Sequence, residues 1–334
     1  MEILDSPTGE KAAGRCISMN AYTAGVDVGG TKVAYGLFDN GKALISKRAH
    51  STEQGLSPAE FLRGVADQLR VLCEDQGVDP ESLNGVGLGL PCFIRQPDGH
   101  IIKSSNIPTL RDFPARGFLE DMLGIHIELG NDTHAAGLAE NRQGAGRGHE
   151  CMLYCSVSSG ISSAPILNGK LFRGSYGFAG ESGHMVVTPG EGITCACGKQ
   201  GCFMSWCSGH MIAQHIQRWI SQGGETIMLD MADGDPMKIT AHELKRAWEM
   251  GDDMAARAVD QMQKYLSLWF FDLYVFTNIN CFVLGGGLLK MGSSFWDEVE
   301  RRFRALDDGG SPVFFKRAEL GDDTGIIGAN ELLY

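Results

Sequence analysis

A short segment between Gly180 and Cys202 constrains this chain more than any other, because it gathers four metal-binding side chains. It reads GESGH from Gly180 to His184 and CACGKQGC from Cys195 to Cys202. Three cysteines and one histidine at this spacing are the ligand set of a closed tetrahedral zinc site. We therefore expect a structural Zn²⁺ here, beside a binding pocket that includes Glu181. The expected zinc ligands are His184, Cys195, Cys197 and Cys202.

Buried apolar cysteines and a disulfide are the alternative readings of this segment. Cys195 and Cys197 are separated by one residue, so a disulfide between them would be strained. The chain has 10 cysteines, and its first 20 residues contain no long apolar stretch of the kind found in a signal peptide. This combination is typical of a reducing compartment, where cysteines serve as metal ligands or core residues. We expect zinc binding and a cytoplasmic location.

Length and composition limit the classes of protein to which this chain can belong. The 334 residues are enough for two domains with cores of their own, and 43% hydrophobic and 21% charged residues are ordinary for a globular protein. The net charge of -12 does not favour nucleic acid or an anionic membrane surface as a partner. No apolar run is long enough to span a bilayer. Residues 1–20, which contain Pro7 and Gly9, are expected to form a flexible leader.

A glycine-rich hairpin is predicted near the N-terminus. Residues 22–38 read as a strand, a turn and a second strand, and Asn40-Gly41 signals a further hairpin turn. In the first turn, glycines would let backbone N–H groups approach an anion, a carboxylate could hold Mg²⁺, and polar side chains could contact phosphate. A plain tight turn is an equally good interpretation. The residues concerned are Asp27, Gly29, Gly30, Thr31 and Lys32.

Two polar positions follow predicted strands. Asn106 lies in a polar loop after Ser104 and could bind a hydroxyl-rich ligand, although such an asparagine is more often a turn former. Asn131 and Asp132 stand where a strand over 126–129 runs into a helix over 135–142. The simplest role of this pair is to cap the helix. Alternatively, Asp132 lies at a cleft edge and accepts a proton from a substrate hydroxyl.

The second half of the chain contains two more turns that could bind anions. Residues 158–163 form a loop of small residues between strands over 151–157 and 164–167, and Ser159 and Gly160 suit a phosphate. Gly285, Gly286 and Gly287 follow a strand and precede a helix, although they lack the spacing of a dinucleotide site. Asn168-Gly169 predicts a two-residue hairpin. The expected helices cover 58–77, 208–221, 241–250, 254–276 and a short stretch from 324.

The long helix over 254–276 carries apolar residues at intervals of three and four. Its apolar side chains fit either core packing or a subunit interface. The aromatic run around Trp269 would support a homodimer.

These motifs together resemble the ROK family of sugar kinases and transcriptional repressors, from about Tyr22 onward. The resemblance implies an α/β protein of the two-lobed actin/hexokinase-like (ribonuclease H-like) class, with ATP and sugar in the cleft between the lobes. It implies a small lobe over 21–131, joined by a C-terminal helix at 318–334. It also implies a large lobe over 132–317 that carries the zinc segment 180–202.

The resemblance also implies roles for individual residues. Asp132 would be the general base of an ATP- and Mg²⁺-dependent kinase that phosphorylates a hexose or hexose derivative, at its 6-hydroxyl. His184 would contact the sugar while its ring also binds zinc. Within the family, the 104–110 loop and residues 207–209 look closest to allose kinases. The sugar contacts would come from Asn106, Asn131, Glu181 and His184.

Two departures from the family pattern bear on function. Met204 stands where the family usually has a glutamate that contacts sugar. Ser158 and Ser162 replace glycines of the second phosphate loop, where their side chains could crowd the phosphates. These departures leave a catalytically weakened sugar-binding or regulatory protein as the alternative to a kinase. A transcriptional repressor is disfavoured, because fewer than 30 residues precede Asp27 and the chain is acidic.

Overall fold

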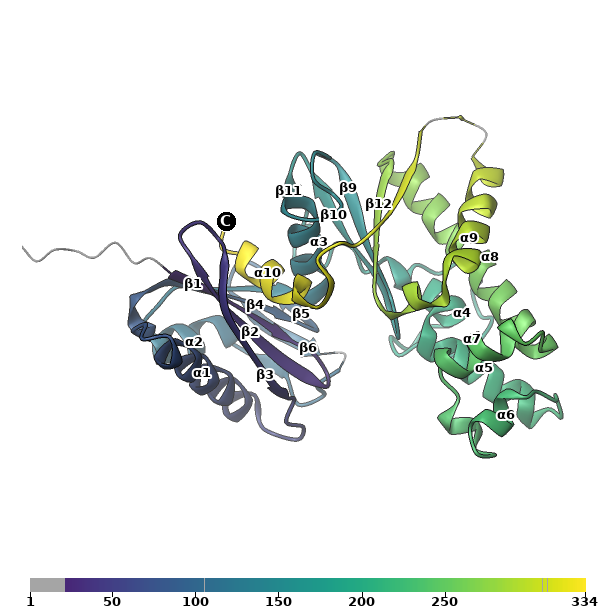
Figure 1. Ribbon diagram of the computed structural model, residues 1–334, viewed down its shortest axis with the longest axis horizontal. Helices are drawn as coiled ribbons and strands as arrows, with labels where there is room; N and C mark the ends of the chain where they lie inside the picture. The colour runs from purple at the N-terminus through teal and green to yellow at the C-terminus, as the bar shows by residue number, and fades with distance from the viewer. Residues whose placement is uncertain (1–21, 105, 308, 311) are drawn as a thin grey trace, which may run out of the picture.

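The structure is a computed structural model that describes residues 22–104, 106–307, 309–310 and 312–334. The expected leader at 1–20 lies outside these residues. Figure 1 shows two groups of strands with helices on both sides of each. In chain order the elements are β1 (Tyr22–Val28), β2 (Lys32–Asp39), β3 (Leu44–Ser51), α1 (Pro58–Asp75), β4 (Leu83–Leu90), β5 (Cys92–Arg95), β6 (His100–Ser104), β7 (Arg111–Phe113), α2 (Ala115–Leu123), β8 (Ile127–Asn131), α3 (Asp132–Arg142), β9 (Met152–Val157), β10 (Ile161–Leu167), β11 (Lys170–Leu171), α4 (Phe203–Cys207), α5 (Gly209–Ser221), α6 (Met228–Met231), α7 (Ala241–Glu249), α8 (Asp253–Thr277), β12 (Cys281–Gly285), α9 (Ser293–Leu306), β13 (Phe314–Arg317) and α10 (Thr324–Glu331).

The first sheet has the strand order β3-β2-β1-β4-β8, in which β1, β4 and β8 run parallel. Side chains alternate between the two faces of a strand. Ala24, Val26 and Val28 accordingly join the apolar core formed with α1 and α2. The opposite face carries Gly25 and Gly87, where a Cβ would overlap carbonyl oxygens of α10. This face is thus open enough for the C-terminal helix to lie directly on the sheet.

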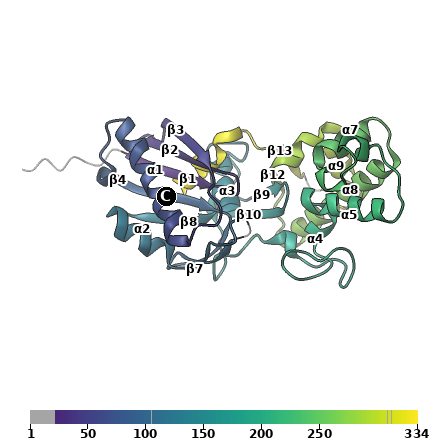
Figure 2. The same cartoon turned by 90° about the horizontal axis from the view of Figure 1, so that it is seen from below.

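The second sheet has the order β11-β10-β9-β12-β13. On β9, Met152 and Tyr154 pack with Ala135 and Leu138 of α3. Neighbouring residues of β9 point the other way, into a large core shared with α5, α8 and α9. Helices α3 and α10 contact each other and therefore lie as a middle layer between the two sheets (Figures 1 and 2).

The helices that the sequence predicts lie close to their expected positions, whereas α2, α4 and α6 were not predicted and several turns differ. The hairpin after β2 is longer than the predicted Asn40-Gly41 turn, and its left-handed residue is Lys42 (φ 63°). The predicted loop over 158–163 is wrong in its second half, because β10 already begins at Ile161. A 3₁₀ turn at Gly287–Met291 separates β12 from α9. The Asn168-Gly169 turn is confirmed, with both residues at positive φ.

The apolar cores separate the chain into two lobes. One core draws on residues between Ala24 and Leu129, and the other on residues between Leu153 and Val313. A smaller three-stranded sheet of β5, β6 and β7 extends the first lobe. None of the helices in the described part of the chain combines the length and hydrophobicity that crossing a bilayer requires.

Candidate active site

Parallel strands bring Asp27 and Asp132 to the same edge of the first sheet. Asp27 pairs in register with Gly89 of β4, and Gly89 pairs with Gly130 of β8. Asp132 begins α3 immediately after β8. The carboxyl ends of parallel strands are the usual place for ligand sites in α/β proteins. Two carboxylates that are distant in sequence therefore lie in one candidate site.

Both carboxyl groups are perturbed by this setting. Burial raises the pKa of Asp132 to about 7, with the negative charge of Asp27 as the next cause and the Thr133 N–H opposing them. Burial also raises the pKa of Asp27 to about 6, and the charge of Lys32 opposes that shift. Neighbouring carboxylates with raised pKa values favour a proton or a divalent cation between them. Asp132 is therefore a carboxyl group whose pKa lies near neutral pH.

The two asparagines predicted to bind sugar occupy different settings. The side-chain oxygen of Asn131 accepts hydrogen bonds from the N–H groups of Thr133 at 2.9 Å and His134 at 3.4 Å, so it caps α3 as its simplest interpretation predicted. Its Nδ2 lies 3.5 Å from the Cys92 carbonyl oxygen. Asn106 is exposed and contacts Gly30, where an added Cβ would lie 3.1 Å from the Asn106 Cβ. The Asn106 loop and the first glycine turn therefore adjoin.

Helix α3 also holds the segment that leads to Glu181. His134 Nε2 lies 2.7 Å from the carbonyl oxygen of Ala179, to which it donates a hydrogen bond. Burial lowers the pKa of His134 to about 4, so the ring is neutral at physiological pH. The Ser163 N–H donates to the Gly180 carbonyl oxygen at 2.8 Å. These bonds place Glu181 near Asp132, whose pKa the charge of Glu181 also raises.

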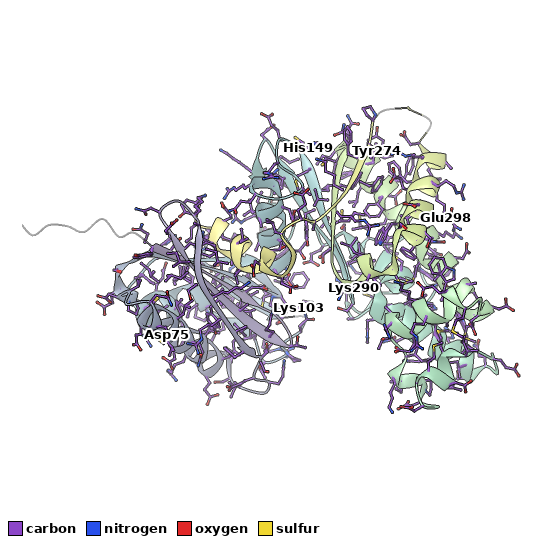
Figure 3. The ribbon with its side chains drawn as sticks, in the orientation of Figure 1. Asp75, Lys103, His149, Tyr274, Lys290 and Glu298 are labelled. Carbon is purple, nitrogen blue, oxygen red and sulfur yellow. The ribbon has the colours of Figure 1, made fainter. Side chains whose placement is uncertain are left out.

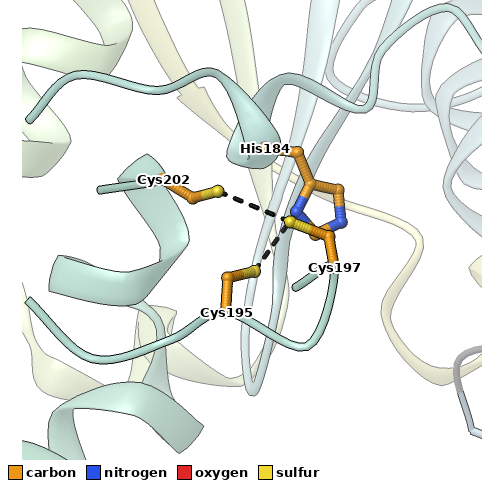
Figure 4. Close-up of side chains that lie close together, drawn as sticks. All are labelled: His184, Cys195, Cys197 and Cys202. Atoms are coloured by element: carbon orange, nitrogen blue, oxygen red, sulfur yellow. Dashed lines mark hydrogen bonds between the residues drawn. The ribbon is translucent and has the colours of Figure 1, made fainter. Parts of the chain in front are cut away.

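The four expected zinc ligands come together (Figure 4). One ligand atom from each of His184, Cys195, Cys197 and Cys202 lies within 4.8 Å of every other. His184 Nδ1 is 3.4 Å from Cys195 Sγ, and the Sγ atoms of Cys197 and Cys202 are 3.6 Å apart. A tetrahedral site with Zn–S bonds of about 2.3 Å needs ligand atoms roughly 3.8 Å apart. The donor set therefore fits a zinc ion.

The histidine of this cluster has a second neighbour. His184 Nε2 lies 3.9 Å from Glu181 Oε2, on the other side of the ring from Cys195. A metal that binds Nδ1 would fix the ring orientation and leave Nε2 as a hydrogen-bonding group beside the carboxylate. The metal cluster and Glu181 are thus parts of one structural unit.

The first glycine turn has the geometry of a tight hairpin. The Gly29 N–H donates to the Lys32 carbonyl oxygen at 2.8 Å, and Thr52 Oγ1 donates to the Gly29 carbonyl oxygen at 2.7 Å. Thr31 and Lys32 are exposed at its tip. The turn satisfies these backbone groups internally, and Lys32 at its tip is near enough for its charge to oppose the raised pKa of Asp27.

A cavity of about 1120 Å³ lies in the second lobe, between the β9–β10 turn, α5 and the 3₁₀ turn after β12. Ser159 and Gly287 line it, as predicted for nucleotide contacts. Gly160 immediately precedes β10, and a Cβ on Gly285 or Gly286 would overlap Tyr154 Oη or the Val157 carbonyl oxygen, so both positions require glycine. The remaining lining residues include Ser158, His210, Gln214, Gln217, Thr240 and Leu288.

One expectation about the second phosphate loop changes. Ser162 belongs to β10, and its hydroxyl lies 2.7 Å from that of Thr133, so it links this strand to the helix of Asp132. It is therefore directed away from the turn it was expected to crowd. Met204 lies beside the turn, since its methyl carbon would be 3.8 Å from a Cβ on Gly160.

Sequence reasoning missed the residues that hold the site in place. His134 and Thr133 had no motif to mark them, although both follow the Asn131-Asp132 pair directly. His210 and Gln214 stand four residues apart on α5 and share a contact of 2.9 Å. Their polar spacing on a largely apolar helix was the available signal.

Comparisons with known proteins agree with this arrangement. The sequence profile of the ROK family matches residues 23–334. A glucokinase from Halalkalibacterium halodurans is 31% identical over 317 residues, which cover 93% of this chain and 94% of that protein. The crystal structure of a ROK hexokinase from Thermus thermophilus superposes with a TM-score of 0.80 at 31% identity, over 93% of this chain and 97% of that one.

A second solved structure contains ligands. The ROK family glucokinase from Streptomyces griseus, in complex with glucose and AMPPNP, has a TM-score of 0.76 at 27% identity and covers 93% of this chain and 98% of its own. The family match extends over nearly the whole chain, and a relative above 30% identity supports it. The protein therefore belongs to the ROK family, within the actin/hexokinase-type superfamily.

Proposed function

We propose that this ATP-dependent sugar kinase phosphorylates a hexose or hexose derivative at its 6-hydroxyl, with Asp132 as the general base. The observation that carries the proposal is the position of Asp132, which lies between Asp27 on one lobe and the segment of Glu181 on the other. A glucokinase relative and a related glucokinase in complex with glucose and AMPPNP support the substrate class.

Proton transfer is the step for which Asp132 is suited. Its ionised carboxylate accepts the proton of the sugar hydroxyl as that oxygen attacks the γ-phosphorus of ATP, and ADP departs with the electrons of the broken bond. A base works best when its pKa lies near the working pH. The pKa of about 7 meets this requirement.

The residues around Asp27 fit a magnesium ion. Two carboxyl groups with raised pKa values lie close together, and Lys32 is the cation that lowers the pKa of Asp27. Mg²⁺ favours carboxylate, phosphate and water oxygens, and in kinases it neutralises charge on the transferred phosphoryl group. Asp27 would hold the ion or its waters, while the Gly29-Gly30 hairpin and the Ser159-Gly160 turn position the phosphates.

We assign sugar recognition to the polar residues around Asp132. Glu181 and His184 Nε2 offer neighbouring polar atoms, and zinc bound at Nδ1 would keep them in place. Asn106 and the Nδ2 group of Asn131 complete the set. The base of the nucleotide would occupy the cavity beside α5, with Gly287 at its wall.

The test is an ADP-release assay with a panel of hexoses and N-acetylhexosamines, in the presence of Mg²⁺. We expect sugar-dependent ADP release and a product whose phosphorus couples to the protons on carbon six in NMR. Phosphate on another carbon would overturn the choice of hydroxyl. Sugar binding by calorimetry without ATP binding would instead identify a regulatory sugar-binding protein, the alternative that Met204 beside Gly160 keeps open.

A further inference from the structure

One wall of the large cavity in the second lobe comes from the zinc segment. Gly192, Ile193 and Thr194, which directly precede Cys195, line the cavity, and so does Gln200. Sites for drug-sized ligands have volumes of roughly 300–1,000 Å³, so a cavity of about 1120 Å³ has room for a nucleotide that touches this wall. The segment that carries the expected zinc ligands therefore also borders the proposed nucleotide site.

The same cavity contains the residues expected to hold a nucleotide. Ser159 and Gly287 line it, and Leu288 follows in the 3₁₀ turn that Lys290 marks in Figure 3. The His210 N–H donates to the Ser159 carbonyl oxygen at 3.2 Å, which joins the beginning of α5 to the β9–β10 turn. The zinc segment, the β9–β10 turn and α5 are therefore walls of one cavity.

The charges around this cavity suit an anionic ligand. None of the described residues that line it is acidic, whereas His210 and Arg218 can carry positive charge. A cavity lined in this way does not repel the phosphates of a nucleotide.

The side chains of Thr194 and Gln200 form a polar pair on the wall that the zinc segment contributes. Gln200 Nε2 donates a hydrogen bond to Thr194 Oγ1 at 3.3 Å, and both residues are exposed. Within the described part of the chain, these two side chains form no other hydrogen bond. The second Nε2 hydrogen and the side-chain carbonyl oxygen of Gln200, together with the Thr194 hydroxyl hydrogen, are therefore available to a ligand in the cavity.

The loop that carries the polar pair is held at several points. A Cβ on Gly192 would lie 2.7 Å from Cζ2 of Trp206, so the loop backbone rests on this ring. Trp206 Nε1 donates to Thr188 Oγ1 at 2.9 Å. The Cys195 N–H donates to the Lys199 carbonyl oxygen at 2.8 Å, which closes the turn between the two members of the pair. Binding groups on such a preformed loop lose little conformational entropy when a ligand arrives.

We propose that Thr194 and Gln200 are nucleotide-binding residues, so that the zinc segment serves both substrates of the kinase. His184 at the start of the segment lies at the sugar, and the polar pair contacts the nucleotide. The inference rests on the proposed binding of ATP in this cavity and of sugar at His184. A metal ion that holds His184 and Cys195 would then fix a wall of the nucleotide site together with a sugar contact.

The experiment measures ADP binding by calorimetry to the wild-type protein, to Gln200→Leu and to Thr194→Val, two substitutions that remove polar groups and keep the approximate size of the side chain. We expect each variant to raise the Kd for ADP by roughly 3- to 10-fold, the range for one lost hydrogen bond. The zinc content by elemental analysis and the Kd for glucose should keep their wild-type values. Gln76→Leu, which removes an exposed amide from the first lobe, is the matched control and should bind ADP normally.

The zinc and glucose measurements separate a direct contact from a structural role. If both variants lose zinc or glucose affinity together with ADP affinity, the polar pair stabilises the loop and the inference is overturned. Unchanged ADP affinity in both variants would also overturn it, while the proposed kinase activity would stand. A wild-type protein that binds no ADP would overturn the proposed function, and this inference with it.

Discussion

Asp27 and Asp132 stand at the carboxyl ends of parallel strands in one sheet, and the charge of Asp27 contributes to the raised pKa of Asp132. Burial is the larger cause of that shift. The two residues therefore titrate as neighbours, and the protonation state of Asp132 depends on what binds at Asp27. Any cation held there would lower the pKa of Asp132 from its value in the free protein.

Turnover should depend on pH through Asp132. A general base acts in its ionised form, so activity should be present above the pKa and lost as the pH falls through it. We expect kcat/KM for the sugar, which reports the free enzyme, to fall tenfold per pH unit below about 7. A stopped assay at constant ionic strength from pH 5 to 9 measures this. A flat profile down to pH 5 would contradict the assignment.

Replacement of Asp132 by asparagine should remove the base and preserve its shape. We expect kcat to fall by about 10²–10⁴ while the Kd values for sugar and nucleotide change little. Single-turnover measurements separate the chemical step from product release. Asp272→Asn, a change on α8 far from the strand ends, serves as the control. Near-normal turnover of Asp132→Asn would exclude Asp132 from the mechanism.

The same substitution should make the ligand-free protein more stable at alkaline pH. The pKa of Asp132 is higher in the folded protein, about 7, than its ordinary value of 3.8, so its ionisation destabilises the fold by an amount that grows between about pH 4 and pH 7 and is complete above pH 7. Asparagine avoids this cost, and we expect a gain of roughly 1–3 kcal/mol at pH 8, reduced because the group is partly exposed. The gain should shrink as the pH falls toward 4. Urea unfolding at pH 8 and pH 5 measures it, and an equal effect at both values would argue against the shift.

Loss of a zinc ligand should affect both folding and sugar binding. Cys197→Ser removes one donor of the cluster, and structural zinc contributes about 10–16 kcal/mol to the folding of small finger peptides. We expect loss of bound zinc by elemental analysis, a lower Tm and a weaker Kd for the sugar, because His184 is no longer held. Cys151→Ser, a cysteine outside the cluster, is the control. Full zinc content in Cys197→Ser would contradict the assigned ligand set.

The buried carboxylate of Glu331 should stabilise the protein at neutral pH. It accepts hydrogen bonds from Lys42 at 3.0 Å, from Gln143 at 2.8 Å and from Arg142. Burial alone would raise the pKa of Glu331, but these bonds outweigh it and hold the pKa below its usual value. Its contribution is therefore present above pH 4.5 and lost as the pH falls further.

We expect Glu331→Gln to cost about 3 kcal/mol at pH 7, since it leaves the cations of a buried pair without their partner. The difference between the wild-type and variant proteins should be smaller at about pH 3 than at pH 7, because the stabilising charge of Glu331 is lost as the pH falls. Denaturant unfolding at both pH values checks the difference, with Glu225→Gln on the surface as the control. A loss that is independent of pH would indicate a packing effect instead.

The sequence was most informative where the chemistry is local. The four expected zinc ligands lie within one segment, so their spacing alone predicted that they meet. The cap of α3 could also be predicted from the sequence, because the Asn131 side chain bonds to the backbone N–H groups two and three residues further along. The functional assignment of Asp132 needed the resemblance to a family, since a helix cap and a catalytic base have the same sequence signal.

Contacts between distant segments could not be predicted in the same way. The bond from His134 to Ala179 and the bond between Thr133 and Ser162 depend on how α3 packs against β10. Glycine runs were ambiguous for a related reason. Gly287 lines the cavity, whereas the neighbouring Gly286 lies against the backbone of β9. Nothing in the sequence distinguishes these two adjacent glycines.

The glycines at Gly25 and Gly87 have a consequence for biosynthesis. They leave one face of the first sheet uncovered until α10, which follows the second lobe in the chain, packs on it. On a ribosome, the lobe that is translated first would therefore be completed last, after the second lobe has assembled. Stalled nascent chains that lack α10 should be cleaved by protease within β1 and β4, while their second lobe resists.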